Sequence, residues 1–440
     1  MIESRSPAIS IIVPTRNRCE SLGRTLDALK NQTLPALTME VLVVLDECTD
    51  DTKSMLEGYQ TDFSLRTFTL DSRRGPAVAR NFGARSACGA LLLFLDDDVV
   101  PDPHLVQAHI DAHLRNPHSV VLGPYRPILR QGADCFRLMQ FMWWNDKFMS
   151  LQQYGRRFSY TDILSGNLSI ETRRFRELGG FDERFPAAHE DYELGIRLIK
   201  AGLNVVVDRH ATARHYEHEH MTIERSFRRA KQEGRADVLI ARRHPTLIRT
   251  LPFASLHQQT AWPHRLIRFL AYRRPAFGAR LAELSASLLP ILDRCRFRRS
   301  FHNLYKGLRY YSYVSGVAQE TGSASETGAL LEKGRLPEGP IHEIDLDLRD
   351  GLPNAEARLD RDRPVAARLW HGEQFVGRMP FQPGAEPLRG RHLRPILAGS
   401  LAWPYLMALV MDTARNRDAP SPTHDQSCQP FRRTRDSTCR

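Results

Sequence analysis

A run of five apolar residues, Leu91 to Leu95, leads directly into three consecutive carboxylates at Asp96, Asp97 and Asp98. A buried strand cannot leave three anions unpaired at its end, because each charge would lose its hydration with nothing positive to replace it. A hard divalent cation is the natural partner of such carboxylates. The alternative is a solvated turn after the strand. The triplet therefore predicts a cation site or a turn, and the rest of the sequence bears on the choice.

The same arrangement, an apolar run followed by polar residues, occurs twice upstream. Ile9 to Val13 precedes Pro14 and Thr15, and Val41 to Leu45 precedes Asp46. Segments with helical spacing lie between and after these runs. Strands that alternate with helices predict a parallel sheet with right-handed crossovers, and ligands of such sheets sit beyond the carboxyl ends of the strands. We therefore expect an α/β fold in which these polar residues and the triplet converge on one edge.

Seven segments follow one another along the chain: SIIVPTRNR, VLVVLDECTDDT, GPAVARNFGA, LLLFLDDDVVPDP, SGNLSI, GGFDERF and HEDYELGIRLIKAG. In this order they resemble the family 2 glycosyltransferases of GT-A fold, over about residues 8–220. The resemblance implies a Rossmann-like, mostly parallel sheet flanked by helices. It also implies transfer of a sugar from a nucleotide diphosphate sugar, with inversion at the anomeric carbon and with Mn²⁺ or Mg²⁺ as cofactor.

The resemblance implies that several residues bind the nucleotide sugar. Asp46 matches an acid that contacts the base, and a carboxylate suits the N–H donor of a uracil imide. The family usually carries two acids here, and Leu45 replaces the first. Asp46 could instead be a charge that precedes a helix N-terminus. Arg80 matches a basic position that faces the nucleotide, or is an ordinary surface cation. Pro14 and Thr15 are also expected to bind the nucleotide sugar.

The triplet matches the DxD motif, with Asp96 and Asp98 in the outer places, and residues two apart on an extended chain point the same way. Asp98 is the first metal ligand that the resemblance implies, and Asp96 the second. Asp96 and Asp97 are also expected to contact the ribose hydroxyls or metal-bound waters. His215 follows the strand expected at 205–207 and is a further candidate ligand. The histidines around it could equally form a solvated loop, or a structural zinc site that lacks cysteines.

A second acidic centre, Glu190 and Asp191, begins an amphipathic helix that ends near Gly202. Asp191 matches the family's catalytic base, which removes the proton of the acceptor hydroxyl, and Glu190 is expected beside the donor. The two acids could instead simply complement the helix dipole. Gly166 and Asn167 resemble a loop that lines the donor and acceptor pocket, although an ordinary turn would have the same sequence.

Composition indicates the compartment and the surfaces. The seven cysteines are scattered without CxxC pairs, which favours a reducing compartment, and no secretory signal is evident at the start. We expect a cytoplasmic protein, peripheral at the inner face of the cell membrane.

The formal charge of +11 is concentrated after the catalytic half. Arginines there alternate with apolar residues around 265–274, which predicts a helix on an anionic membrane surface or a helical subdomain packed on the catalytic domain. No nucleic-acid-binding module is recognised, and no apolar run approaches the roughly 20 residues needed to cross a bilayer.

The remaining sequence predicts further parts, because a Gly/Ser/Thr-rich stretch at 321–328 precedes two segments of alternating polarity. The expected organisation is a GT-A catalytic domain over 1–225, a basic amphipathic helical region over 226–320, a linker over 321–340, a small β-rich appendage with a terminal apolar helix over 341–412, and a disordered tail over 413–440.

These features predict a metal-dependent, inverting glycosyltransferase that uses a UDP-sugar, or a sugar carried by GDP or dTDP, and a carbohydrate, lipid-linked or other acceptor. Phe136 to Tyr160, rich in Met and Trp, is the expected acceptor side. One alternative is a noncatalytic, membrane-associated subunit with the same fold. Another is a sugar nucleotidyltransferase, which would ordinarily carry a glycine-rich phosphate loop after the first strand, where this chain has PTRNR.

Overall fold

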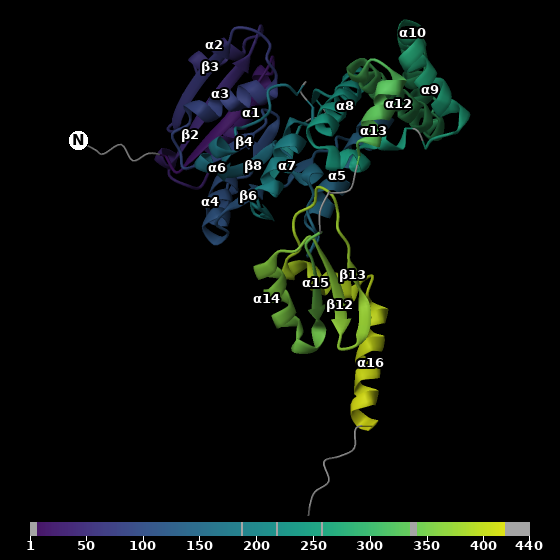
Figure 1. Ribbon diagram of the computed structural model, residues 1–440. Helices are drawn as coiled ribbons and strands as arrows, with labels where there is room; N and C mark the ends of the chain where they lie inside the picture. Colours follow the sequence, from purple (N-terminus) through teal and green to yellow (C-terminus); the bar gives the residue numbers. More distant parts are fainter. Residues whose placement is uncertain (1–6, 186–187, 217–218, 257, 335–340, 419–440) are drawn as a thin grey trace, which may run out of the picture. The chain divides into compact units, whose positions relative to one another are not determined.

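The structure, a computed structural model, describes residues 7–185, 188–216, 219–256, 258–334 and 341–418. The chain divides into two compact units (Figure 1). Unit 1 contains Met1–His342 and Phe381–Leu388, and unit 2 contains Glu343–Pro380 and Arg389–Arg440. All of the site residues predicted from the sequence lie in unit 1.

A seven-stranded sheet with the order β3-β2-β1-β4-β8-β6-β9 forms the centre of unit 1. Its strands are β1 (Ile9–Thr15), β2 (Met39–Asp46), β3 (Ser64–Leu70), β4 (Leu91–Leu95), β6 (Ser119–Leu122), β8 (Asn167–Glu171) and β9 (Asn204–Val207). β8 runs antiparallel to β4 and β6, whereas the other pairings of this sheet are parallel. The mostly parallel α/β fold predicted from the sequence is therefore confirmed.

Helices flank this sheet, as the alternating pattern predicts (Figure 1). They are α1 (Cys19–Lys30), α2 (Thr52–Glu57), α3 (Pro76–Ser86), α4 (Leu105–Arg115), α5 (Cys135–Leu151), α6 (Thr172–Glu177) and α7 (Glu190–Lys200). All residues of β2 and β4 are buried, which is typical of strands that are covered on both faces. The edge strand β3 is only partly buried.

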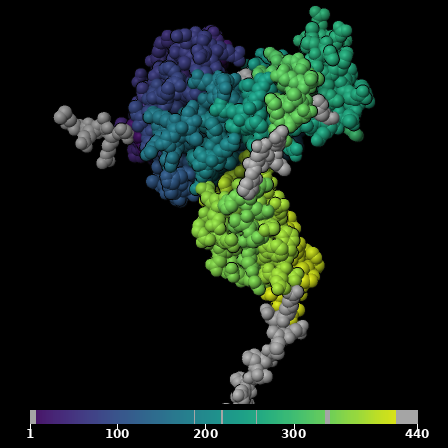
Figure 2. Space-filling model, viewed as in Figure 1, coloured from purple at the N-terminus to yellow at the C-terminus, as the bar shows by residue number. Residues whose placement is uncertain are grey.

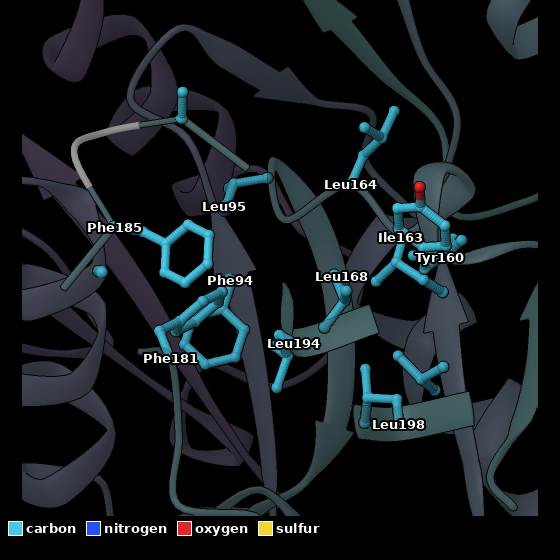
Figure 3. Close-up of a cluster of buried hydrophobic side chains, with 14 of the residues drawn as sticks. Phe94, Leu95, Tyr160, Ile163, Leu164, Leu168, Phe181, Phe185, Leu194 and Leu198 are labelled. Atoms are coloured by element: carbon cyan, nitrogen blue, oxygen red, sulfur yellow. The ribbon is translucent and has the colours of Figure 1, made fainter. Parts of the chain in front are cut away.

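An aromatic cluster packs directly behind the carboxylates that follow β4. The ring of Phe94 lies 5.0 Å from that of Phe175 and 5.1 Å from that of Phe181, between centroids. Figure 3 shows Phe94 and Phe181 beside Leu194 of α7 and Leu168 of β8. This core holds the end of β4 and the start of α7 in a fixed relation, because interiors packed to this density deform little.

A small second sheet brings the end of β4 to a distant part of the chain. It consists of β5 (Val99–Pro101), β10 (Ala213–His215) and β7 (Tyr125–Pro127), in the order β5-β10-β7. β5 and β10 are antiparallel, and His215 is paired with Val99. The backbone N–H of Tyr216 also donates to the carbonyl of Asp98 at 2.9 Å. His215 therefore lies next to the triplet.

Unit 1 continues as a helical region, as the composition predicts. Its helices are α8 (Ile223–Arg243), α9 (Trp262–Arg273), α10 (Pro275–Ala286), α11 (Leu289–Arg294), α12 (Arg298–Thr321) and α13 (Ala324–Glu332). Two glycines let α8 and α12 approach closely. A Cβ at Gly316 would overlap the carbonyl oxygen of Lys231, and one at Gly234 would overlap that of Tyr313.

The linker predicted at 321–340 is wrong over most of its described length. Ser323 caps the N-terminus of α13 by accepting from the N–H of Glu326 at 3.0 Å, and Leu330 of this helix is buried. A Gly/Ser/Thr-rich stretch can therefore form a helix where a serine caps it and a core covers it. Residues 335–340 lie outside the described residues.

Unit 2 is not simply β-rich, because helices accompany its three-stranded sheet. It contains β11 (Glu343–Asp347), β12 (Ala366–His371), β13 (Gln374–Met379), α14 (Leu352–Asp362), α15 (Leu393–Ala398) and α16 (Ala402–Asp418). Residues 381–388, predicted as part of this appendage, belong to unit 1. α16 also continues past the predicted start of the tail at 413, and residues 419–440 lie outside the described residues.

Among the described residues, no helix is by itself both long enough and apolar enough to cross a bilayer. The bent pair Gly390–Ala398 and Ala402–Ala414, with an angle of 87° between its halves, meets the criteria of length and composition only when the two helices are taken together.

Candidate active site

The carboxyl ends of β1, β2 and β4 lie side by side, because β1 pairs with both of the other strands. Thr15 ends β1, Asp46 ends β2 and Asp96 follows β4. The Thr15 hydroxyl donates to Asp97 Oδ2 at 2.7 Å, which ties the first strand to the triplet. The structure thus brings the polar residues to one edge, as the sequence predicts, and Pro14 contributes backbone to β1.

Asp97, the middle carboxylate, faces inward. It is buried and accepts hydrogen bonds from Thr15 and from Arg18 Nη1, the latter at 2.6 Å. Burial raises the pKa of Asp97 to about 6, with the neighbouring charge of Asp98 adding to the rise and Arg18 opposing it. Thr15 and Arg18 therefore hold the Asp97 side chain in place.

Asp98 is paired with His215, and both side chains are buried. Asp98 Oδ1 lies 3.6 Å from His215 Nε2, and Asp98 Oδ2 accepts from Arg18 Nη1 at 2.9 Å. Burial by itself would raise the pKa of Asp98, but His215 and Arg18 outweigh it and hold that pKa below its usual range. Asp98 is therefore an anion held close to an imidazole, a donor pair that suits a divalent metal.

Asp96 is joined to the second acidic centre by Arg80. The buried guanidinium of Arg80 donates from Nη2 to Asp96 Oδ1 at 2.8 Å and from Nη1 to Glu190 Oε1 at 2.9 Å. It also lies over the ring of Phe181, 5.5 Å from the centroid. Arg80 is thus not the surface cation considered from the sequence. It links the end of β4 to the start of α7.

Asp191 lies in the first turn of α7, half-buried, with its Oδ1 accepting from the N–H of Tyr192 at 2.9 Å. Burial raises the pKa of Asp191 to about 6, and the charge of Glu190 adds to the rise, whereas His189 and Arg80 oppose it. A carboxylate with this pKa is a stronger base than an ordinary aspartate and is still ionised at neutral pH. The position therefore suits a general base.

A buried network, which the sequence analysis missed, supports the start of α7. His189 precedes the helix with a φ of 59° and stacks on Tyr192, with ring centroids 4.4 Å apart. His189 Nδ1 lies 2.8 Å from Asp237 Oδ1, and the Tyr313 hydroxyl donates to Asp237 Oδ2 at 2.6 Å. Asp237 and Tyr313 belong to α8 and α12, far from Asp191 in sequence, and no local motif marks them.

Asp46 contacts backbone in the structure. Its Oδ1 accepts from the N–H of Arg74 at 2.6 Å and its Oδ2 from the N–H of Gly75 at 3.0 Å. Gly75 has a φ of 88° and precedes α3, so Asp46 fixes the segment that leads to Arg80. Asp46 is therefore not the N-terminal charge of α2 that was considered from the sequence.

The two residues of the SGN turn have different surroundings. A Cβ on Gly166 would lie 2.9 Å from Asp96 Oδ2 and from the ring of Tyr125, so glycine is required for Asp96 to take its place. Asn167 is fully buried, donates to the carbonyl of Ala211 at 2.9 Å, and lies 2.8 Å from His109 Nε2. Gly166 borders the site, whereas the side chain of Asn167 packs inside the fold.

Arg18 is a further residue that the sequence analysis did not single out, although it lies in the quoted segment SIIVPTRNR. Its pairing with two carboxylates becomes visible only when the end of β1 is placed beside β4. Of the histidines near His215, His218 lies outside the described residues. The part of the chain that the structure describes contains no group of three or more His, Cys, Asp or Glu side chains that could hold a metal by itself, so the zinc alternative gains no support there.

Comparison with known proteins finds glycosyltransferases. Residues 10–179 match the family described as Glycosyl transferase family 2, and residues 146–221 match the N-terminal domain of galactosyltransferase. Validoxylamine A glucosyltransferase from Streptomyces hygroscopicus subsp. jinggangensis is 30% identical over 282 residues, which cover 57% of this chain and 64% of that protein. Poly(ribitol-phosphate) beta-N-acetylglucosaminyltransferase TarS from Staphylococcus aureus strain Mu50 is 34% identical over 117 residues, covering 26% and 20% respectively.

Among solved structures, a mannosyltransferase from Pyrobaculum calidifontis in complex with GDP-Man and Mn²⁺ has a TM-score of 0.47 and 18% sequence identity, covering 72% of this chain and 88% of that one. The chain spans less than two thirds of the length of its first two curated relatives, 64% and 60%. The family match runs from β1 to α6 and includes the carboxylate triplet. Over residues 10–179, the chain is thus similar to glycosyl transferase family 2.

Proposed function

We propose that this protein transfers a sugar from a UDP-sugar to a hydroxyl group of an acceptor, with inversion at the anomeric carbon. One observation carries the proposal: Arg80 joins Asp96, the neighbour of the candidate ligand residues, to Glu190, the neighbour of the candidate base. Arg80 thereby fixes the position of the candidate metal-binding residues after β4 relative to Asp191, the candidate base. Displacement reactions need such fixed positions of the reacting groups.

The donor set at the end of β4 fits Mn²⁺ or Mg²⁺. Asp98 and His215 would hold the ion, since their nearest side-chain atoms lie 3.6 Å apart. Carboxylate oxygen binds both metals, whereas imidazole nitrogen suits the transition metal Mn²⁺ better than Mg²⁺. Remaining positions would fall to donor phosphate oxygens and water, as is usual for Mg²⁺. When bound, the ion would neutralise charge on the departing nucleoside diphosphate. Asp96, already engaged by Arg80, is assigned to the ribose hydroxyls or to a metal-bound water.

Asp191 is assigned as the base that takes the proton of the acceptor hydroxyl while its oxygen attacks the anomeric carbon. One base suffices, because the leaving group departs as a phosphate anion. The raised pKa of Asp191, about 6, supports this role. Glu190 holds Arg80 and, through its charge, contributes to that raised pKa.

The nucleoside is assigned to the side of Asp46 and Thr15. Asp46 fixes the backbone at 74–75, and each of its oxygens keeps a second lone pair that can accept the imide N–H of uracil. Thr15, at the same edge of the sheet, orients Asp97 through the hydrogen bond from its hydroxyl. These assignments are proposals that a nucleotide-bound structure would test directly.

The acceptor is assigned to the side of α5. Trp143 is exposed on this helix, and Trp144 packs edge-on against His215 with centroids 4.9 Å apart. A pocket beside His215 is lined mainly by apolar side chains, among them Phe136 and Met221. An exposed indole can stack on a sugar face, and an apolar pocket suits the less polar part of a glycan or of a lipid-linked acceptor.

We also propose a cytoplasmic setting. The cysteines that the structure describes are free thiols: Cys19, Cys48, Cys88, Cys135 and Cys295. Five free thiols among the described residues fit a reducing compartment.

The test is release of UDP in the presence of Mn²⁺ from a panel of UDP-sugars. Asp191→Asn should keep donor binding but lower turnover by at least ~10²-fold, because the amide cannot accept the proton. Asp62→Asn, an exposed carboxylate outside the site, is the matched control and should behave like the wild type.

Two outcomes would contradict the proposal. If the wild type binds sugar nucleotides but releases no UDP with any sugar or acceptor offered, the noncatalytic alternative holds. If it forms pyrophosphate from UTP and a sugar 1-phosphate, it is a nucleotidyltransferase.

A further inference from the structure

Two neighbouring helices of unit 1 carry apolar stripes that face outward. On α9, Trp262, Leu266 and Phe269 are exposed, and on α10, Phe277, Leu281 and Leu284 are exposed. The six side chains are between 41% and 73% exposed. In each helix the spacing is i, i+4, i+7, which places the three residues on one face. We call these two faces the outer stripes.

The outer stripes are not needed for packing, because the opposite faces of the same helices already fill the core. Leu270 and Ala271 of α9 are buried in the main hydrophobic core. In α10, a Cβ on Gly278 would lie 2.6 Å from the Tyr311 hydroxyl, so this helix rests closely on α12. Large apolar residues gathered on one exposed surface mark a site of interaction, whereas scattered ones do not.

Exposed cations border the outer stripes. Arg265, Arg273, Arg274 and Arg280 are exposed, and none of them pairs with an acid in the part of the chain that the structure describes. Residues 262–299 contain nine arginines and no lysine, but only two acids. One of these acids, Asp293, is turned toward α5, where its Oδ1 accepts from the N–H of Cys135 at 3.1 Å. The surface is therefore strongly positive as well as apolar.

By contrast, several arginines of the adjoining α8 and α12 pair with acids within the fold. Arg235 and Arg242 both pair with Glu320, and Arg309 pairs with Glu233 at 2.7 Å. These pairs reduce the net charge of α8 and α12, whereas no such pair is found for the exposed arginines of α9 and α10 in the described part of the chain. Figures 1 and 2 show α9 and α10, in the teal-green of residues 262–286, at the end of unit 1 remote from β2 and β3.

We propose that the α9 and α10 surface docks on an anionic lipid bilayer. Trp, Phe and Leu side chains of the outer stripes would enter the boundary between headgroups and acyl chains, and the bordering arginines would contact lipid phosphates. A nucleic acid would satisfy the arginines but offers no apolar phase for the six stripe residues. An acidic protein surface would likewise leave most of them in water. The inference does not depend on the proposed transferase activity.

The test uses the full chain and co-sedimentation with vesicles. Vesicles of phosphatidylcholine mixed with phosphatidylglycerol should retain the protein, and vesicles of phosphatidylcholine alone should retain much less. Arg273→Gln, Arg274→Gln and Arg280→Gln combined should weaken partitioning onto the anionic vesicles by roughly 10²-fold, since each arginine near such a surface contributes about fivefold. Leu281→Gln with Leu284→Gln should weaken it by at least ~10-fold.

Matched controls change the same kinds of residue elsewhere on unit 1. Leu37→Gln with Leu114→Gln removes two apolar side chains that are 86% and 77% exposed. Arg85→Gln with Arg173→Gln removes two exposed cations. Both control variants should partition like the wild type, and thermal melts should show that all variants are folded.

Three results would overturn the inference. In the first, the wild-type protein stays in solution in the presence of anionic vesicles. In the second, the stripe variants and the control variants lose vesicle binding equally. In the third, the wild type binds a DNA duplex more tightly than vesicles at the same salt concentration. Donor turnover measured without vesicles separates this result from the proposed function. A variant that has lost vesicle binding but still releases UDP shows that only docking was removed.

Discussion

Three carboxylates in a row after β4 have three different surroundings. Asp97 is buried under Thr15 and Arg18, Asp98 faces His215, and Asp96 faces Arg80. The sequence predicts that the outer two point the same way on an extended chain, but Asp97 and Asp98 form a turn, in which the N–H of Val99 donates to the carbonyl of Asp96 at 3.1 Å. The sequence does not indicate which partners the carboxylates meet, because these come from β1, β10 and α3.

At the scale of single residues, the pKa of Asp191 predicts a pH dependence. Because this pKa is about 6, lowering the pH through 6 should protonate the base and reduce kcat/KM, approaching about tenfold per pH unit. Asp97 also has a pKa near 6, so a control must identify the group. Glu190→Gln removes the charge that helps to raise the pKa of Asp191 and should move the midpoint to lower pH. A pH–rate profile that is flat between about pH 5 and pH 8 would contradict the role of Asp191.

The Asp237 carboxylate gives a second prediction at this scale. Asp237→Asn removes the charge opposite His189, and we expect a loss of about 1–3 kcal/mol in the free energy of unfolding and a lower kcat at unchanged donor affinity. Burial opposes the charged form of His189, but Asp237 outweighs it and raises the pKa of that histidine. The contribution is therefore fully present below the unfolded pKa, about 6.5, and is lost as the pH rises through the folded value.

Denaturant unfolding at several pH values would check this sign. The difference between wild type and variant should shrink toward alkaline pH. Tyr313→Phe, which removes only the hydroxyl that donates to Asp237, should show a smaller effect with little pH dependence. A constant difference at all pH values would show that the charge of His189 plays no part.

At the scale of elements, the contact between α8 and α12 depends on a glycine. In Gly316→Ala the new Cβ would overlap the carbonyl of Lys231, so the helices must separate, at a cost of about 1–3 kcal/mol. Gly307 lies in the same helix with open space around it, and Gly307→Ala should instead stabilise the protein by up to ~1 kcal/mol. Thermal unfolding of the two variants makes the comparison, and equal effects would mean that the close approach is not tight.

Elements with a continuous or periodic apolar pattern could be predicted from the sequence, and their contacts could not. β1, β2, β4 and α7 are where the pattern places them, because burial alone selects their residues. The helix α13 was missed, since its Gly and Ser content is typical of a loop and only Ser323 and the surrounding core make it helical. The network of His189, Asp237 and Tyr313 could not be predicted either, because no short-range motif joins α7 to α8 and α12.

At the scale of the whole molecule, unit 1 is completed by a segment, Phe381–Leu388, that lies in sequence between the two parts of unit 2. Glu386 Oε1 accepts from the N–H of Phe158 at 3.0 Å, its own N–H donates to the carbonyl of Phe158 at 2.8 Å, and the N–H of Tyr160 donates to Gly384 at 2.9 Å. A chain ending at His342 would lose these bonds. We expect the shortened chain to unfold at lower temperature and to release UDP more slowly than the full chain. If residues 343–440 were an independent appendage, their removal would change neither property. Unchanged melting and turnover would show that residues 381–388 are dispensable.

The proposed function depends above all on Asp98 and His215 acting together toward one cation and one nucleotide pyrophosphate. The most direct measurement is titration calorimetry of UDP into the wild type and into Asp98→Ala, each with Mn²⁺ and with chelator. The wild type should bind UDP more tightly with Mn²⁺ than with chelator, by at least ~10-fold, and Asp98→Ala should lose that difference. Equal affinity for UDP with and without Mn²⁺ in the wild type, or a difference that survives in Asp98→Ala, would contradict the proposed metal-dependent binding of the nucleotide at Asp98.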